Sequence, residues 1–130
     1  MPNGMTKTMK PTDSELEILQ VLWQEGPSTV RQVNERLAEN RDVGYTTTLK
    51  LMQIMYEKGL LTRLEEARSH VYEANVSEEE TQSTLLERFV DTAFRGSASK
   101  LVMQALGNHK TTPAELDEIR KLLDQIEKQP

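Results

Sequence analysis

The sequence predicts a mainly α-helical chain that contains one small β-hairpin. Apolar residues recur at the three- and four-residue spacing of amphipathic helices over most of the chain. Only the region after Gly59 replaces that spacing with two short segments that mix β-favouring and polar residues. Helix starts are marked as well, because a hydroxyl residue stands three positions before a glutamate at Thr12, Ser77 and Thr112, which is the capping-box pattern.

The first two helices are predicted from their ends. The first follows the Thr12 cap, covers residues 13–25 and is ended by Gly26-Pro27. Ser28 can cap the second helix, whose inward residues recur at helical spacing up to Leu37. A polar stretch over residues 39–44 then separates this helix from the next one.

A third helix is predicted to start near Tyr45 and to end at Gly59. The buried face is predicted to consist of Tyr45, Leu49, Met52, Met55 and Tyr56, with Thr48 and Leu51 flanking it. The opposite, exposed face is predicted to consist of Thr46, Thr47, Lys50, Gln53 and Glu57.

Residues 60–64 and 70–74 are predicted to form the two strands of the hairpin, with residues 65–69 as its turn. The order over residues 12–75 is therefore helix, helix, helix, hairpin. That order describes a winged helix-turn-helix domain. Residues 1–11 are predicted to form a disordered leader, because they contain no pattern that could bury apolar surface.

Residues 76–130 are predicted to form a helical dimerisation domain. Apolar stripes predict one helix over residues 78–94, a short one closed by Gly107 and a last one after the Thr112 cap. Fewer than about 70 residues rarely fill a core alone, so a second copy of the chain is the simplest cover for these stripes. The predicted dimerisation residues are Leu85, Leu86, Phe89, Val90, Leu101, Val102, Leu116, Ile119 and Leu123.

Composition excludes several functions. The chain has no cysteine, so disulfides, thiolate metal sites and cysteine nucleophiles are excluded. No catalytic motif is present, and neither an enzyme, a metal site nor a cofactor is expected. No apolar run approaches the roughly 18 residues of a membrane span, and the first ten residues lack the apolar segment of a secretory signal. We therefore expect a cytoplasmic protein without membrane insertion.

The residues of the first helix and the hairpin resemble a known family. Ser14 to Trp23 followed by Gly26-Pro27 resembles the first-helix signature of the penicillinase repressor family, which includes the β-lactamase and methicillin-resistance repressors. Residues 45–49 and 57–61 look like its recognition helix and the start of its wing, and residues 67–72 like its wing strand, with Ala67 where a glycine is common. The resemblance covers about residues 12–127 and is specific over the first 75.

The resemblance implies a homodimeric repressor that binds a pseudo-palindromic DNA operator. In several members of the family a membrane sensor-protease pathway ends with a cut in the C-terminal domain. By alignment that cut would fall near Gln104 and Ala105, where the antibiotic-responsive members carry an Asn-Phe pair. The copper-responsive members carry a cysteine-rich tail, which this chain lacks. The inducer therefore stays open.

Candidate DNA contacts follow from the helix-turn-helix geometry, in which the first turns of the recognition helix meet base edges. Thr46 and Thr47 can bond bases or phosphates, and Lys50 can contact guanine or phosphate. Tyr45 either packs in the core or reaches a phosphate. Further phosphate ligands are Arg68, which is favoured in the wing, and then Arg63 and Arg31.

The net charge of −5 keeps an alternative open, namely a winged helix that docks a partner protein through the same face. Residues 27–75, however, contain 7 basic and 7 acidic residues, so the predicted DNA-reading segment is neutral. The acidic excess belongs to the flanking segments. The charge therefore predicts modest non-specific DNA affinity and leaves more of the recognition to base contacts.

Overall fold

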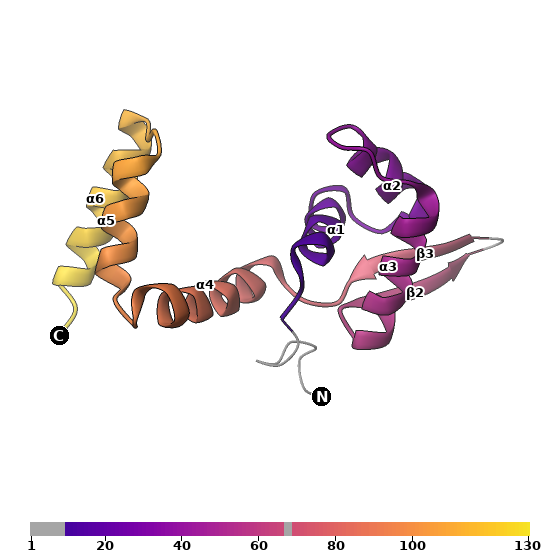
Figure 1. The fold of residues 1–130 in the computed structure, drawn as a ribbon. Helices are drawn as coiled ribbons and strands as arrows, with labels where there is room; N and C mark the ends of the chain where they lie inside the picture. The colour runs from indigo at the N-terminus through magenta and orange to yellow at the C-terminus, as the bar shows by residue number, and fades with distance from the viewer. Residues whose placement is uncertain (1–9, 67–68) are drawn as a thin grey trace. The chain divides into compact units, whose positions relative to one another are not determined.

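The computed structural model describes residues 10–66 and 69–130, and Figure 1 shows its helices and strands in chain order. The fold is mainly helical with a small antiparallel sheet, as predicted. Residues 1–9 of the predicted leader lie outside the described part of the chain. The elements are α1 (Asp13–Glu25), β1 (Ser28–Thr29), α2 (Val30–Ala38), α3 (Tyr45–Lys58), β2 (Leu61–Glu66), β3 (Ser69–Ala74), α4 (Glu78–Phe94), α5 (Ala98–Asn108) and α6 (Pro113–Glu127).

The sheet has the strand order β1-β3-β2, and both pairings are antiparallel. The hairpin register pairs Leu61 with Ala74 and Arg63 with Tyr72, so the strands begin and end within two residues of their predicted limits. Strand β1 was not predicted. It has only two residues, Ser28 and Thr29, and its strand character comes from pairing with Tyr72 and Val71 of β3, which is distant in the sequence.

Side chains cap the helix starts largely as predicted. Thr12 with Glu15 and Thr112 with Glu115 form complete capping boxes. Ser77 accepts the backbone N–H of Glu80 at 3.0 Å, which is half of the third box. The backbone N–H of Thr112, together with its side chain, holds the pKa of the Glu115 carboxyl below its usual value.

Two helix ends differ from the prediction. Thr29, and not Ser28, caps α2, and its partner in a complete capping box is Gln32. Ser28 is committed to β1, and its hydroxyl donates to the Gly26 carbonyl at 2.9 Å. Helix α5 also continues through Gly107 to Asn108, because one glycine lowers helix stability without ending a helix that continues to bond.

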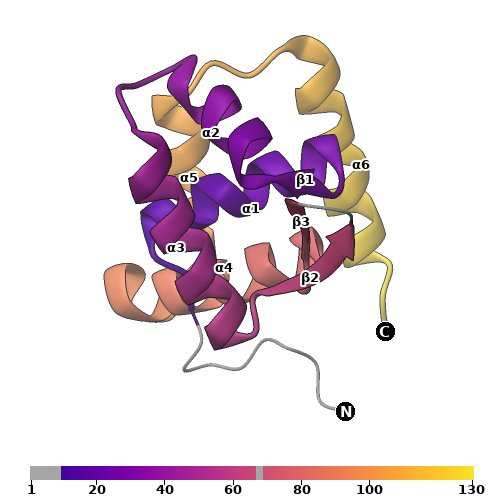
Figure 2. The same ribbon diagram turned by 90° about the vertical axis from the view of Figure 1, so that its right-hand side faces the viewer.

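The core lies between α1, α2, α3 and the sheet. Its fully buried side chains include Ile18 and Leu19 of α1, Val33 of α2, and Met52 and Met55 of α3. Each such burial stabilises the fold by about 1.5–3 kcal/mol relative to exposure. In Figures 1 and 2 the three helices gather around the sheet, and α3 lies against β2.

The prediction that Tyr56 is buried was wrong, and Tyr45, for which packing in the core and contact with a phosphate were both left open, does not pack in the core. Tyr45 is 50% exposed and Tyr56 38% exposed, whereas Met52 and Met55 are fully buried. Both tyrosines lie on one edge of the apolar stripe of α3, because positions separated by eleven residues are almost eclipsed on a helix of 3.6 residues per turn. The edge of Tyr56 contacts the Tyr72 ring of β3, with the ring centroids 6.4 Å apart. This edge of α3 therefore faces the hairpin at the border of the core, to which Tyr72 belongs.

Spatial contacts divide the chain into two units, of which the first ends at Glu87 and the second runs from Arg88 to Pro130. The start of α4 belongs to the first unit. Just before it, the indole N–H of Trp23 donates to the carbonyl of Val76 at 3.0 Å and ties the segment after β3 to α1. The division predicted between residues 75 and 76 follows the sequence pattern and stays a prediction.

The helices of the second unit leave their apolar residues uncovered. Helices α5 and α6 contain no buried residue, and the only buried residue of α4 is Thr81 in its first turns, where the chain belongs to the first unit. Phe89 is 53% exposed and Met103 is 73% exposed. Helices α5 and α6 run in opposite directions on either side of the 109–112 connection (Figure 1). The unit therefore has no hydrophobic core of its own among the described residues.

Candidate nucleic-acid interface

The exposed face of α3 is the first part of the site. Thr46, Thr47 and Lys50 are all exposed, as predicted, while Thr48 in the same turn is fully buried. Successive residues of a helix are rotated by about 100°, so this face points away from the core that Met52 and Met55 enter. Within residues 10–66 and 69–130 the three exposed side chains form no hydrogen bond or ion pair. They are therefore available to a ligand.

A groove of about 350 Å³ lies between the start of α2, α3 and β3. It brings together two of the residues that the sequence singled out, Arg31 of α2 and Tyr45 of α3, with His70 of β3. Gln53 of α3 also lines this groove. The groove borders the exposed face of α3, so the polar face and the groove form one continuous candidate surface, called here the α3–wing face.

The wing arginines have different positions. The guanidinium carbon of Arg63 lies 4.4 Å from the ring centroid of Tyr56, which is a cation–π arrangement. Arg63 is thus held against α3, and it does not extend freely from the wing. Arg68 lies outside the described residues, so its assignment as a phosphate ligand stays a prediction.

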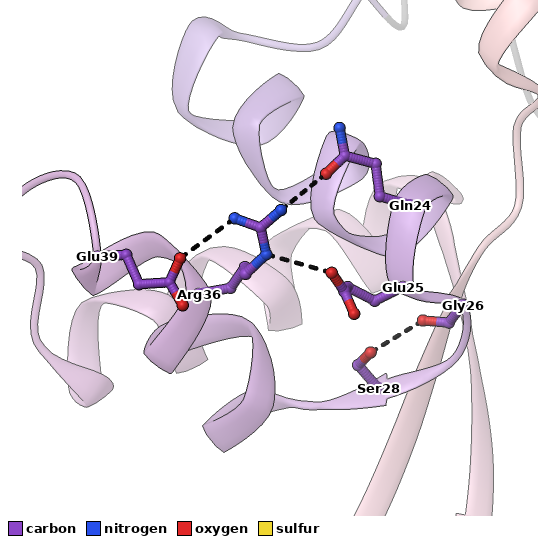
Figure 3. A network of polar contacts seen from close by, with 6 residues as sticks. All are labelled: Gln24, Glu25, Gly26, Ser28, Arg36 and Glu39. Atoms are coloured by element: carbon purple, nitrogen blue, oxygen red, sulfur yellow. Dashed lines mark hydrogen bonds and ion pairs between the residues drawn. The ribbon is translucent and has the colours of Figure 1, made fainter.

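Two arginines in α2 and the connection after it are neutralised by carboxylates of α1 and of the end of α2. Arg36 bonds Glu25 at 3.2 Å, Glu39 at 3.4 Å and the amide oxygen of Gln24 at 3.0 Å (Figure 3). Arg41 pairs with Glu17 at 2.7 Å in the same manner. Arg36 thus links α2 to α1, and Arg41 links the connection after α2 to α1.

Lys58, in the last turn of α3, is also paired. Its ammonium group binds both carboxylate oxygens of Glu15, at 2.9 and 3.0 Å. Arg31 and Lys50, by contrast, make no ion pair in the part of the chain that the structure describes. The free positive charge of the winged helix is thus concentrated on the α3–wing face, although the segment as a whole is neutral.

Two residues of this region were missed as site residues. Gln53 was predicted to be exposed on α3 but was not proposed as a site residue, although it lines the groove. It stands three residues after Lys50, and residues with this spacing are neighbours on a helix surface, so the spacing could have identified it. Asn34 of α2 was not singled out. Its amide bonds Thr48 and the carbonyl of Val43, and no local sequence pattern marks an amide that acts across a connection of six residues.

The predicted dimerisation residues lie on α4, α5 and α6. Leu86, Phe89, Val102 and Leu123 are exposed, and the others are half-buried: Leu85, Val90, Leu101, Leu116 and Ile119. Gln104 and Ala105, the predicted cleavage region, are exposed within α5.

Neither a metal site nor a membrane span is present in the described chain. No group of three or more potential metal ligands occurs in residues 10–66 and 69–130. Over the same residues, none of the helices has the length and apolar character needed to cross a membrane. His70 is in contact with the edge of the Tyr72 ring, at 6.5 Å between centroids.

A family model described as "Penicillinase repressor" matches residues 11–125 of this sequence. The chain belongs to the penicillinase repressor family. It is 23% identical over 121 residues to a penicillinase repressor of Bacillus licheniformis. That match covers 93% of this chain and 94% of the Bacillus protein. The chain is 29% identical over 128 residues to the transcriptional regulator BlaI of Mycobacterium tuberculosis, which covers 95% of this chain and 89% of that protein.

Part of this chain has a counterpart among solved structures. The solution structure of the DNA-binding domain of the repressor BlaI matches with a TM-score of 0.51 and 26% identity. The match covers 58% of this chain and 93% of that domain. The family resemblance and the winged-helix fold predicted from the sequence are therefore confirmed. Because the family consists of transcriptional repressors, the prediction that the chain is not an enzyme is confirmed as well.

Proposed function

We propose that this chain is a homodimeric repressor that reads operator DNA through the α3–wing face. The observation that carries the proposal is the distribution of free and paired cations in the winged helix. Arg31 and Lys50 are free beside the exposed threonines of α3, whereas Arg36, Arg41 and Lys58 are bound to carboxylates elsewhere. A face that binds phosphate needs uncompensated positive charge, and a solvated face does not.

The residues of this face are assigned to different parts of the DNA. Thr46 and Thr47, in the first turn of α3, are assigned to base edges in the major groove, where a hydroxyl bonds a base and a methyl group touches thymine. Lys50, one turn later, is assigned to guanine or phosphate. Arg31 and Tyr45, which line the groove, are assigned to phosphates and fix the register of the domain on the duplex.

The wing is assigned to the DNA backbone. Arg68 is the favoured phosphate ligand, because a guanidinium binds phosphate oxygens as a fork. Arg63 is a weaker candidate than its charge suggests, since its guanidinium is stacked on the Tyr56 ring at 4.4 Å. Leaving that ring for a phosphate would cost the stacking energy, about 0.5–1 kcal/mol at an exposed site.

A second copy of the chain is proposed to cover the apolar residues of α4–α6. Exposed apolar side chains on three consecutive helices are typical of an interface between proteins. The dimer would carry two winged helices. Their recognition helices would enter successive major grooves of a pseudo-palindromic operator, with half-sites separated by about one helical turn, roughly 34 Å. Repression follows by blocking access to the promoter.

Induction by a membrane sensor-protease pathway is part of the proposal, with cleavage near Gln104 and Ala105. Both residues are exposed in α5, a helix of 11 residues without a buried side chain. In the single chain, a helix this short and without packing unwinds easily, and a protease requires an extended substrate, so cleavage would act on α5 where it is not covered by the second copy. The Asn-Phe pair of the antibiotic-responsive members is absent here, so a protease of different sequence preference would be needed.

The test uses Thr47→Ala, Lys50→Ala and Arg68→Ala in the full chain. The probe is a duplex selected by the wild-type chain from random-sequence DNA. All three variants should bind it more weakly, and Lys50→Ala and Arg68→Ala should also flatten the salt dependence of the affinity, because each removes a cation that displaces counterions. Lys128→Ala, which removes one positive charge outside the winged helix, is the matched control.

Wild-type affinity in all three variants would mean that the α3–wing face is assigned wrongly. The alternative function, a winged helix that docks a protein, predicts a different result for the wild type. A chain that selects no preferred sequence even at low salt would favour that alternative.

A further inference from the structure

The start of α3 is held by a side-chain network that crosses the connection between α2 and α3. One amide hydrogen of Asn34 is donated to the carbonyl of Val43 at 3.0 Å, and the other to the hydroxyl of Thr48 at 2.9 Å. The Thr48 hydroxyl donates in turn to the carbonyl of Gly44 at 3.3 Å. The network therefore joins the middle of α2, the residue before the cap of α3, the cap itself and the first turn of α3.

The network uses the full donor capacity of its members. An asparagine amide has two N–H groups, and both are bonded here. Thr48 is fully buried, so its hydroxyl has no solvent to replace a lost partner. Replacing Asn34 by an apolar residue would leave the Val43 carbonyl without this donor.

No side chain caps α3, which makes the network important for the position of its first turn. The cap residue is Gly44, and it makes no side-chain hydrogen bond to the helix, whereas Thr12, Thr29, Ser97 and Thr112 cap α1, α2, α5 and α6. The direction in which the chain enters α3 is therefore set from outside, by the amide of Asn34. Thr46 and Thr47 lie in the turn that this amide positions.

We propose that Asn34 is a positioning residue for sequence discrimination: its amide sets the orientation of the first turn of α3, and with it the angle at which Thr46 and Thr47 meet the bases. The inference rests on the proposed function, in which those threonines read DNA. Base contacts require placement within a fraction of an ångström, while contacts to phosphate tolerate more movement. Loss of the network should consequently reduce selectivity more than it reduces non-specific binding.

The experiment measures two affinities for each variant of the full chain. One probe is the duplex that the wild-type chain selects from random-sequence DNA, and the other is a scrambled duplex of equal length. Asn34→Ala should reduce the ratio of the two affinities about tenfold, the scale of one or two lost base contacts. Thr48→Val, which removes the hydroxyl at nearly constant shape, should reduce it in the same direction, and Thr48→Ser should restore it.

Asn75→Ala is the matched control. The Asn75 amide donates to the carbonyl of Gly59 at 3.0 Å, so this variant removes the same kind of bond at the opposite end of α3. It should lower the unfolding temperature without changing the affinity ratio. A structural role alone would make Asn34→Ala resemble this control, with both duplexes losing affinity in proportion to the unfolded fraction. That outcome would overturn the inference.

If Asn34→Ala does not fold, the two Thr48 variants provide the test. Equal affinity ratios for Thr48→Val and Thr48→Ser would overturn the inference. If the wild type selects no duplex, the proposed function fails, and with it the role of Asn34 in discrimination. Amide hydrogen exchange separates the two failures. If Asn34 positions α3 but the chain reads no DNA, the Thr48 amide, which bonds Gly44, should exchange faster in Asn34→Ala than in the wild type. The Leu60 amide, which bonds Met55, should exchange at the wild-type rate.

Discussion

At the scale of the residue, three consecutive threonines show that the position on a helix gives identical side chains different roles. Thr46 and Thr47 are exposed, while Thr48 is fully buried and bonded to Asn34. A rotation of about 100° per residue is enough to place one hydroxyl in the core network and the other two on the proposed DNA face. The same distinction divides the cations, because Lys58 is bound to Glu15 whereas Lys50 is free on the α3–wing face.

The Glu15–Lys58 pair gives a prediction at this scale. The Glu15 side chain is 4% exposed and accepts from both the Thr12 backbone and Lys58. Glu15→Gln keeps an acceptor for Thr12 but removes the charge opposite Lys58, so we expect the free energy of unfolding to fall by about 1–2 kcal/mol. Urea denaturation at fixed protein concentration measures this.

Glu17→Gln is the control for that prediction. The Glu17–Arg41 pair joins the same kinds of charge, but its side chains are 45% and 44% exposed. Solvent screening limits such a pair to about 0–1 kcal/mol. An equal loss of stability in the two variants would show that the burial of Glu15 adds nothing.

At the scale of the element, the helices of the two units use their apolar stripes differently. Helices α1–α3 bury theirs against each other and the sheet, with Leu19, Val33 and Met52 fully buried. Helices α4–α6 have comparable stripes but leave them open, apart from the first turns of α4. An isolated helix of this length is marginal in water, so α5 and α6 require packing that the single chain does not provide in its described residues.

Phe89→Asp tests this conclusion. Phe89 is 53% exposed on α4, so the change should not disturb the folding of the first unit, but it would place a carboxylate in the proposed dimer interface. We expect sedimentation of the variant to show monomers. Gln82→Asp adds the same charge at an exposed polar position of α4 and should remain dimeric. If Phe89→Asp is still a dimer, the stripe of α4 is not the interface.

At the scale of the whole molecule, the net charge of −5 and the proposed DNA binding are compatible. Ion pairs neutralise the cations of the winged helix away from the α3–wing face and leave Arg31 and Lys50 free there. An acidic chain with a small free basic surface should bind random DNA weakly. Its affinity for an operator then depends on base contacts and on the presence of two reading units in one dimer.

The number of cations that contact phosphate determines the salt dependence of binding. With Lys50 on its phosphate alternative, Arg31, Lys50 and Arg68 in each protomer place about six cations on phosphates per dimer, so the logarithm of the affinity should fall with the logarithm of the salt concentration at a slope of about −5. Lys50→Ala should change that slope by about 2 units, since each protomer loses one contact. Arg63→Ala, which removes a stacked cation, should change it less. A titration between low and moderate salt measures all three slopes, and a flat wild-type profile would contradict the phosphate assignment.

Much of this protein could be predicted from local sequence. The limits of α1 and α4, the capping boxes at Thr12 and Thr112, and the helix–helix–helix–hairpin order follow from periodicity and capping, which act between neighbours in the chain. The exposed face of α3 follows from the same periodicity. These features need no knowledge of what lies on the other side of a helix.

Only the tertiary structure decided the rest. Strand β1 exists because β3 pairs with it, Tyr56 lies at the edge of the core in contact with Arg63 and Tyr72, and Asn34 acts on α3 because the chain folds back across residues 39–44. The pairing of Arg36 and Arg41, which leaves the free cations on one face, likewise joins α1 to residues more than ten positions away in the sequence. Such contacts join residues distant in the sequence, and their geometry is set by the packed core and not by any local pattern.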